Sequence, residues 1–470
     1  MMDHAADRVA ATLAAARVAS RDWAGWPVHA RLAVIARARR LLARDAEALA
    51  AALSDLRPAA ETLVAEVLPL AEAARFLERR AAALLAPRRL HGGRPLWLLG
   101  VQAEIRREPA GVVLVLGPSN YPLFLPGAQV LQALAAGNAV CAKPAPGCTA
   151  ILEAFAAILT RAGLPDGVLH LLDPEAGQAA VRAGFDHIVL TGSATTGRRV
   201  LADAAAMLTP ATMELSGSDA VFVLPGADLD LVAAVLAYGL RLNGGATCIA
   251  PRRVFATPAD AAALETRLLA LVASIPPARV TPAVRARLDV LLAEAEAAGA
   301  RVLGGLDAVM TPVIVADATP GLRLLREDVF APVLSFVPAS DMEAALQADA
   351  LCPYALGASI FGPQATAYAF AARVRAGSVV VNDLIVPTAD PRLPFGGRGE
   401  SGFGSTRGAE GLLELTRIKT VSIRTGRTRP HLAPAQPNDR ANFTAMLQLL
   451  HGSAADKFQA LRRLARRGRA

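Results

Sequence analysis

The stretch Pro109-Ala-Gly-Val-Val-Leu-Val-Leu-Gly-Pro-Ser-Asn120 indicates the fold class of this chain. Its apolar run up to Leu116 is typical of a buried strand, which the following Gly-Pro ends. A helical stretch over 127–136 leads to a second apolar strand over 139–142. A third strand over 186–191 precedes a glycine-bearing turn into a helix. Strands that alternate with helices in this way predict a doubly wound parallel sheet.

Polar side chains follow these three strands. Asn120 comes after the first strand, Lys143 after the second and Ser193 after the third. Ligands of doubly wound sheets bind beyond the carboxyl ends of the strands, so we expect these side chains at one edge. Gly192 and Ser193, with Gly197, can present backbone N–H groups to a phosphate at a helix N-terminus. This signal is weak by itself, because glycine and serine also cap ordinary helices.

A cysteine ends the glycine-bearing segment Asn243-Gly-Gly-Ala-Thr-Cys248, and the carboxylate of Glu214 precedes that segment. Glycines let the backbone approach a bound molecule and leave a neighbouring side chain uncovered. A cysteine in such a place is a candidate nucleophile, and the glutamate is a candidate base for activating water. Each residue considered separately is more often structural, since most cysteines are small buried apolar residues.

Length and composition predict an α/β protein of two or more domains. The 470 residues can bury a large core, and aliphatic residues dominate an apolar fraction of 53% in which aromatics contribute only 4%. Four cysteines make no disulfide framework, and the seven histidines show no metal-ligand spacing. We therefore expect no metal and a reducing, cytoplasmic setting. The N-terminus lacks the pattern of a secretion signal.

The longest uncharged run, residues 110–142, is long enough to cross a bilayer. Prolines and asparagines interrupt it, which favours a buried strand, a turn and a buried helix of a soluble protein.

A second series of elements begins near Ser218, with a strand over 220–224 and a helix over 229–242. This series predicts a second α/β domain.

The net charge of +8 lies mostly in the C-terminal segment, because residues 425–470 carry nine basic and two acidic residues, a balance of +7. Residues 427–438 are proline-rich and predict a linker. Two helices are expected after it, on apolar residues at helical spacing: Phe443, Met446, Leu447 and Leu450 in the first, Phe458, Leu461 and Ala465 in the second. These helices either dock on the body or on a partner subunit, or bind an acidic partner such as an anionic membrane, nucleic acid or another protein.

Several ordered segments together resemble the signature segments of the NAD(P)-dependent aldehyde dehydrogenase family, from about Trp23 to Lys419. Besides the cysteine segment, they are Leu116-Gly-Pro-Ser-Asn-Tyr-Pro122, Ala135-Ala-Gly-Asn-Ala-Val140, Lys143-Pro144, Thr191-Gly-Ser193, Met213-Glu-Leu-Ser-Gly217, Arg326-Glu-Asp-Val-Phe-Ala-Pro-Val333 and Pro394-Phe-Gly-Gly397.

The resemblance implies three parts and an addition. The dinucleotide-binding domain comprises 1–95 and 109–217, and the catalytic domain comprises 218–418. A small oligomerisation element comprises 96–108 and 419–424, so a homo-oligomer, either a dimer or a tetramer, is expected. Residues 425–470 form the basic extension.

The resemblance also implies roles for individual residues. Cys248 attacks an aldehyde, Asn120 donates to the resulting oxyanion, and Glu214 activates the water that releases a carboxylic acid. The cofactor, NAD or NADP, is held by Lys143, Gly192, Ser193, Gly197, Leu215, Asp328 and Phe330. Asp328 stands where a glutamate is usual. Pro146 stands where many NAD-preferring relatives have a glutamate that binds the ribose 2′-hydroxyl, so a relaxed cofactor preference is expected.

Two other functions stay open from the sequence. Acylating and acyl-phosphate-type reductases of the same superfamily keep the cysteine but commonly lack the carboxylate of Glu214, so its presence favours release of a free acid. The remaining alternative is a non-catalytic scaffold of this fold that acts through its basic tail. Retention of Asn120, Glu214 and Cys248 together argues against a scaffold.

Overall fold

The computed structural model describes residues 2–98, 100–305, 309–427 and 429–467. Six strands form a first sheet in the order β17-β7-β6-β3-β4-β5, and all are parallel except β17. The order reverses between β3 and β6, which places a topological switch point there. The strand bounds are β3 (Val112–Leu116), β4 (Ala139–Lys143), β5 (Leu169–Leu171), β6 (His187–Gly192), β7 (Ala211–Leu215) and β17 (Gly402–Phe403).

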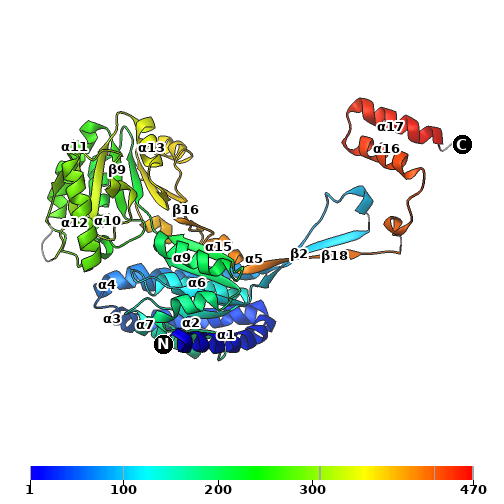
Figure 1. Cartoon of the computed structure of the whole chain (residues 1–470), viewed down its shortest axis with the longest axis horizontal. Coiled ribbons are helices and arrows are strands. Elements are labelled where there is room, and N and C mark those ends of the chain that lie inside the picture. The colour runs from blue at the N-terminus through cyan, green and yellow to red at the C-terminus, as the bar shows by residue number, and fades with distance from the viewer. Residues whose placement is uncertain (1, 99, 306–308, 428, 468–470) are drawn as a thin grey trace. The chain divides into compact units, whose positions relative to one another are not determined.

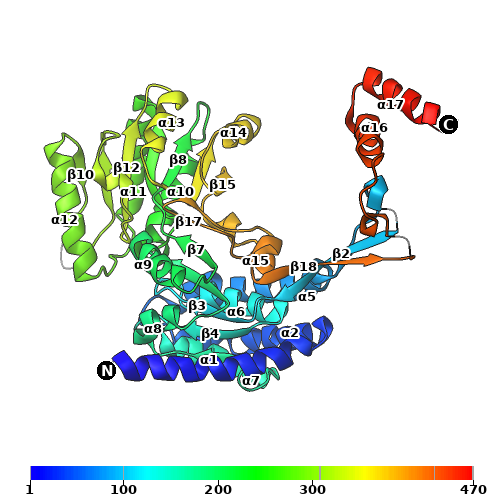
Figure 2. The same ribbon diagram turned by 45° about the vertical axis from the view of Figure 1, so that its right-hand side comes forward.

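Helices cover both faces of this sheet, which confirms the doubly wound prediction. Successive strand residues point to opposite faces, so Val113 and Val115 join one core while Leu114 and Leu116 join the other. The first core includes α2 (Val28–Arg44), α5 (Leu68–Leu85), α6 (Phe124–Ala136) and α7 (Thr149–Arg161). The second includes α1 (Met2–Gly25), α8 (Gly177–Arg182) and α9 (Ala194–Ala205), and Figure 2 shows α1 running along this sheet.

Short elements connect these helices at the start of the chain and before α8. They are α3 (Ala46–Ala51), α4 (Ala59–Thr62), the π-helical turn η1 (Leu63–Val67) and the 3₁₀ turn η3 (Pro174–Ala176).

The uncharged run 110–142 folds as β3, α6 and β4. Among the described residues, no helix is long and apolar enough to span a membrane.

The predicted strand over 109–116 begins later than expected. Gly111 adopts φ +134°, and β3 starts only at Val112. Asp186, expected as the first residue of the third strand, instead accepts a hydrogen bond from the Val112 N–H at 2.8 Å. Its carboxylate satisfies the start of β3, and β6 begins one residue later.

Seven strands form a second sheet in the order β10-β11-β12-β9-β8-β14-β15, with only β10 antiparallel. Figure 1 shows α10 to α13 beside these strands. The strands are β8 (Asp219–Val223), β9 (Pro251–Ala256), β10 (Arg301–Leu303), β11 (Val313–Ala316), β12 (Val333–Pro338), β14 (Gly357–Phe361) and β15 (Ser378–Val381). The helices are α10 (Leu229–Arg241), α11 (Pro258–Val272), α12 (Pro282–Ala297), α13 (Met342–Ala350) and α14 (Gln364–Ala371), with the 3₁₀ turns η4 (Leu242–Gly245), η5 (Arg323–Arg326) and η6 (Val386–Ala389).

The chain returns to the first sheet after the second is complete. β13 (Tyr354–Ala355) pairs with β16 (Arg398–Gly399), and β17 then pairs with β7. Helix α15 (Gly408–Glu414) packs on α5 and α6. Residues late in the chain therefore contribute to the core around the first sheet.

A third sheet has the order β1-β2-β18, formed by β1 (Arg88–Arg89), β2 (Val101–Pro109) and β18 (Thr416–Arg424). Residues 89–104 and 420–470 group as a unit of their own. In it the tail forms α16 (Asp439–His451) and α17 (Ala454–Arg467), after the 3₁₀ turn η7 (Pro430–Leu432); a further turn, η2 (Leu96–Leu98), precedes β2. The two predicted tail helices are thus present, and they pack on each other through Ala445 and Ala460.

An acidic partner for the tail stays a prediction. Phe443, Leu447, Phe458 and Leu461 remain more than half exposed on the two helices. Removing everything after Arg424 is expected to leave the thermal unfolding midpoint of the rest within a few degrees, because α16 and α17 pack on each other. The same truncation should abolish sedimentation with anionic vesicles if a bilayer is the partner. Equal sedimentation of both chains would count against recruitment by the tail.

Candidate active site

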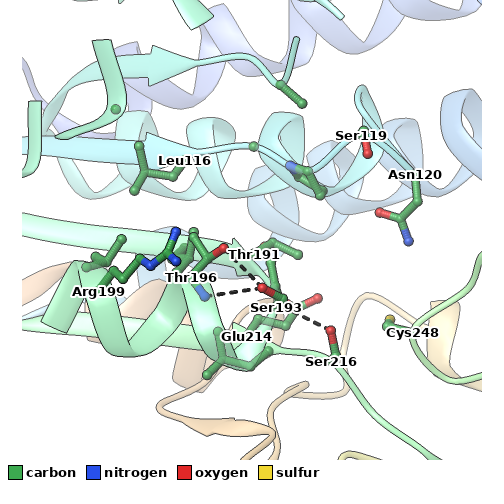
Figure 3. A pocket seen from close by; sticks show the side chains of 18 of the residues that line it. Leu116, Ser119, Asn120, Thr191, Ser193, Thr196, Arg199, Glu214, Ser216 and Cys248 are labelled. Atoms are coloured by element: carbon green, nitrogen blue, oxygen red, sulfur yellow. Dashed lines mark hydrogen bonds between the residues drawn. The ribbon is translucent and has the colours of Figure 1, made fainter. Parts of the chain in front are cut away.

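A cavity of about 880 Å³ lies at the carboxyl ends of β3 and β6, at the switch point of the first sheet. The segment after β3 and the end of β6 line it from the first sheet, and residues preceding β9 and β12 line it from the second. All the predicted site residues except Gly197 line this cavity. Figure 3 shows Asn120, Ser193, Glu214 and Cys248 around it.

Gly197 has a different place from the one predicted. Its N–H donates to the Ser193 carbonyl at 2.9 Å inside α9, so it is not free to bind a phosphate. A Cβ built on Gly197 would lie 2.7 Å from Leu215 Cδ1. Gly197 therefore lets α9 pack closely against Leu215 and does not itself contact a ligand in the cavity.

The N-terminus of α9 is shaped for an anion. Ser193 caps the helix and accepts a hydrogen bond from the Thr196 N–H at 3.2 Å. Unsatisfied N–H groups at such a terminus favour phosphate binding. Lys143 lines the same cavity, and its Nζ donates to the carbonyls of Pro144 at 2.8 Å and Pro174 at 3.2 Å. Partial burial lowers the pKa of Lys143.

The segment that carries Cys248 is held in an unusual backbone conformation. Asn243, Gly244 and Gly245 have φ of +51°, +58° and +74° in succession. A Cβ on Gly245 would lie 2.6 Å from Pro332, so only glycine fits. Buried Arg252 donates to the Gly245 carbonyl at 2.5 Å and to the Ala331 carbonyl at 2.6 Å. This arginine ties the cysteine segment to the strand that follows Phe330.

Burial raises the pKa of the Cys248 thiol, and the carboxylates of Glu214, Asp219 and Asp328 raise it further. The guanidinium of Arg407 acts in the opposite direction. These surroundings favour the neutral thiol over the thiolate. A base must take its proton before the sulfur can act as a nucleophile.

Glu214 lies at the end of β7 and is buried. Its Oε2 accepts a hydrogen bond from Thr406 Oγ1, whereas Oε1 has no hydrogen-bond partner among the described residues. Burial raises the pKa of this carboxyl, while Arg407 and the Thr406 hydroxyl oppose the shift. A buried carboxylate with one unpartnered oxygen and a raised pKa is a candidate general base.

Asn120 is fixed at both ends of its side chain. Its Nδ2 donates to the Ala246 carbonyl at 3.1 Å, and its Oδ1 accepts from the Tyr121 N–H at 3.1 Å. Asn243 Nδ2 donates to the Asn120 carbonyl at 3.1 Å. One N–H of the Asn120 amide is thus used to join the two loops, and the second remains available as a donor toward the cavity.

A buried ion pair supports the Asn120 loop, and the sequence did not reveal it. Glu66 Oε2 accepts from the N–H groups of Leu123 at 2.9 Å and Phe124 at 2.7 Å. Arg57 Nη2 lies 3.4 Å from Glu66 Oε1 and also donates to the Asn120 carbonyl. The two side chains are only 2% and 0% exposed. A single carboxylate in the apolar run 63–70 was the sequence signal for this role.

Asp328 and Phe330 line the cavity from the segment before β12. Burial raises the pKa of Asp328 to about 6, while a hydrogen bond with Ser216 and the charges of Arg252 and Arg287 lower it. Leu215 is buried, with its N–H donating to the Ser401 carbonyl at 3.1 Å.

A second cavity, of about 390 Å³, reaches Cys248 from another side. Cys248, Glu214 and Leu125 line both cavities, so the thiol and the carboxylate lie where the two cavities meet. Arg407 lines the second cavity, with φ +64° and its Cζ 4.3 Å from the centre of the Phe395 ring. Its Nη1 donates to the Thr388 carbonyl at 2.6 Å. Its position soon after the Pro394 motif was the only sequence signal for it.

Replacing Arg57 by methionine is expected to lower the free energy of unfolding by about 3–5 kcal/mol at alkaline pH, where Glu66 is ionised and left buried without its partner. Burial raises the folded pKa of Glu66 to about 7 from its usual 4.5, and loss of Arg57 raises it more. Below neutral pH Glu66 is therefore protonated in the variant, so the loss should grow as pH rises above 7 and shrink below it.

Urea unfolding measures this effect. The double variant Arg57→Met/Glu66→Gln should recover part of the loss, because the uncompensated charge is gone. Arg79→Met, which removes an exposed arginine from α5, should change stability by no more than about 0.5 kcal/mol. Equal losses for Arg57→Met and Arg79→Met would contradict this account of the ion pair.

Comparisons with known proteins agree with this architecture. The model of the aldehyde dehydrogenase family matches residues 1–421. The 4,4'-diapolycopene aldehyde oxidase of Methylomonas sp is 31% identical over 461 residues, covering 94% of this chain and 86% of that protein.

Two solved structures show the same fold. The Mycobacterium tuberculosis aldehyde dehydrogenase complexed with NAD+ superposes with a TM-score of 0.84 at 27% identity, covering 90% of this chain and 92% of that one. The NADP-dependent glyceraldehyde-3-phosphate dehydrogenase of Bacillus halodurans complexed with NADP gives 0.83 at 27% identity, covering 89% and 91%. The resemblance in the signature segments is confirmed, and the chain belongs to the aldehyde dehydrogenase family.

Proposed function

We propose that the protein oxidises an aldehyde to a carboxylic acid with NAD or NADP as hydride acceptor, through a thiohemiacetal and a thioester on Cys248. The observation that carries the proposal is that Cys248 and Glu214 line both cavities. The larger cavity takes the cofactor and the smaller takes the aldehyde. The sulfur of Cys248 then reaches both the aldehyde and the cofactor, and the carboxylate of Glu214 reaches the acyl group bound to that sulfur.

The larger cavity fits a dinucleotide. The α9 N-terminus at Gly192 and Ser193 suits the pyrophosphate, and Lys143 suits a ribose hydroxyl near Pro146. Asp328 and Phe330 lie on the wall shared with Cys248 and suit the nicotinamide end. The two solved relatives carry NAD+ and NADP, which supports the same ligand class here. When bound, this cofactor supplies a two-electron acceptor for hydride.

The first half-reaction begins with transfer of the Cys248 proton to Glu214. The thiolate then attacks the aldehyde carbon, and the carbonyl electron pair moves onto oxygen to give an alkoxide. The Asn120 amide and the Cys248 backbone N–H are the donors for that oxygen, and loss of one such donor typically costs about 3–4 kcal/mol of barrier. As the carbonyl re-forms, hydride leaves carbon and a thioester remains on sulfur.

The second half-reaction hydrolyses the thioester. After Glu214 has released the thiol proton to solvent, it accepts a proton from water while the water oxygen bonds to the acyl carbon, and the carbon–sulfur bond breaks to return the thiolate. Thr406 holds one oxygen of the carboxylate and leaves the other for this proton. The carboxylate favours water over coenzyme A or phosphate as acyl acceptor.

The variant Glu214→Gln is expected to form one equivalent of reduced cofactor only slowly, because the thiol must then lose its proton to solvent, and to stall afterwards, with steady-state turnover lowered about 10²–10⁴-fold. The glutamine cannot accept the proton of the attacking water. In the unaltered enzyme the base must be ionised, and burial raises its pKa, so turnover should rise with pH around a midpoint above the usual 4.5 of a glutamate. Stopped-flow absorbance and the pH profile of kcat measure both effects.

Mass spectrometry of the stalled variant should find the acyl group on Cys248. Cys248→Ala should form no reduced cofactor, whereas Cys352→Ala, which changes a buried cysteine outside both cavities, should keep most of the activity. A Glu214→Gln enzyme that turns over at the normal rate would refute the assigned base.

Cofactor preference is expected to be relaxed, with catalytic efficiencies for NAD and NADP within about a thousandfold of each other (roughly 4 kcal/mol). Pro146 supplies no carboxylate against a 2′-phosphate, and Arg199 lines the same cavity. Pro146→Glu should lower kcat/KM for NADP at least about tenfold and leave that for NAD nearly unchanged. Pro146→Gln is the uncharged control, and an equal effect of both variants would argue against repulsion of the phosphate.

The assembly expected from the sequence also remains a proposal. Ile418 and Ile423 on β18 are 62% and 54% exposed. Apolar side chains of an interface strand are expected to be exposed in this way in a single chain without its partner. We assign β2 and β18 to the contact between copies in a dimer or tetramer.

A further inference from the structure

The smaller cavity is lined mainly by apolar side chains. Two of its polar side chains bind each other, since Tyr121 Oη and Thr247 Oγ1 lie 2.6 Å apart, and Thr388 Oγ1 donates to the Ile385 carbonyl at 2.6 Å. The apolar lining consists of Val64, Ala65, Leu68, Pro69, Phe124, Leu125, Leu242, Ile249, Ile385, Val386, Ala389, Pro391 and Phe395.

The charged residues of this cavity oppose an anionic substrate. Glu214 lies at the Cys248 end, and Glu72 lines the wall as well. Arg407 is the cation among the described lining residues, but it is buried, donates to the Thr388 carbonyl, and lies against the rings of Phe395 and Phe124 at 4.3 and 5.6 Å. A substrate carboxylate would lose its hydration here, and the charge of Arg407 already faces the carboxylate of Glu214.

Three apolar lining residues are exposed to solvent, in contrast to the buried ones around Cys248. Val64, Leu68 and Val386 are 63%, 56% and 54% exposed. They come from η1, α5 and η6, which meet at this cavity. Neighbouring exposed apolar side chains from three separate elements commonly mark a ligand-binding surface.

The backbone around these residues is also irregular. Val64 belongs to a π-helical turn, a feature that occurs frequently at functional sites. Ile385, directly before Val386, has φ +57° and ψ −61°, which is rare for a β-branched residue. Strain of this kind persists where the surroundings fix it and tends to cluster at ligand sites.

We infer that the substrate is an uncharged aldehyde with an apolar chain, whose carbonyl lies at Cys248 and whose chain fills the smaller cavity toward Val64, Leu68 and Val386. The inference rests on the proposed function and names the substrate class for the same site. It predicts a gradient of specificity along the chain length of the aldehyde. Each added methylene that enters an apolar pocket favours binding by about 1–3 kcal/mol, or roughly 10–200-fold.

The first test is a panel of aldehydes assayed for reduced cofactor with NAD and with NADP. The expected result is that kcat/KM rises at least about tenfold from acetaldehyde to hexanal and does not fall for decanal. Pentanal should exceed succinate semialdehyde, which has a similar length but a terminal carboxylate, by at least about a hundredfold. A flat series, or a preference for succinate semialdehyde, would overturn the inference and leave the proposed function intact.

The second test alters the exposed end of the cavity. Leu68→Gln and Val386→Asn should each lower kcat/KM for decanal at least about tenfold more than kcat/KM for acetaldehyde. Val18→Asn is the matched control, because Val18 on α1 is also 54% exposed and lines neither cavity. Equal effects of Val386→Asn and Val18→Asn, or equal losses with decanal and acetaldehyde, would overturn the assignment of this end. Failure of every aldehyde with both cofactors would refute the proposed function itself, and the inference with it.

Discussion

The buried ion pair between Arg57 and Glu66 fixes the loop on which the rest of the site depends. Glu66 holds the N–H groups of Leu123 and Phe124, which begin α6, and Arg57 holds the carbonyl of Asn120. A side-chain amide can stabilise an oxyanion only if its position is set before the reaction begins. The pair provides this from behind the loop, where it contacts neither reactant. A buried ion pair contributes little net stability, because its two charges lose their hydration. The role of Arg57 and Glu66 is therefore to place the backbone of this loop.

The electrostatics of Cys248 follow from where the loops meet. Three carboxylates, those of Glu214, Asp219 and Asp328, raise the pKa of a thiol that burial already raises. A permanently ionised thiolate would be open to oxidation, whereas a neutral thiol beside a base becomes nucleophilic only on proton transfer. Glu214 suits that transfer because its own pKa is raised by the same burial. Burial thus raises both pKa values and favours the protonated form of each group.

Much of the first sheet could be predicted because its strands are continuous apolar runs that end at glycine or proline. The runs that end at Leu116 and Thr191 predicted β3 and β6. These two strands flank the switch point, where Asn120 and Ser193 lie. The same rule could not place Cys248, which precedes β9 and so lies at the amino edge of the second sheet. Only the resemblance to a family brought it to the site. The sequence carries only weak signals for Glu66 and Arg407 and did not predict Arg57, since the roles of all three depend on contacts with residues far away in the sequence.

The carboxyl edge of the first sheet meets the amino edge of the second sheet, which explains why the thiol of Cys248 lines two cavities. The first sheet offers the α9 N-terminus and the loop after β3, both suited to an anionic cofactor. The second sheet offers the cysteine segment and the wall before β12, whose backbone is brought close by Gly245 and Arg252. Apolar residues of η1, α5 and η6 then enclose the other side of the sulfur. On the proposed function, the charged cofactor and the apolar aldehyde occupy separate cavities, so each can be bound by its own chemistry while the sulfur remains common to both.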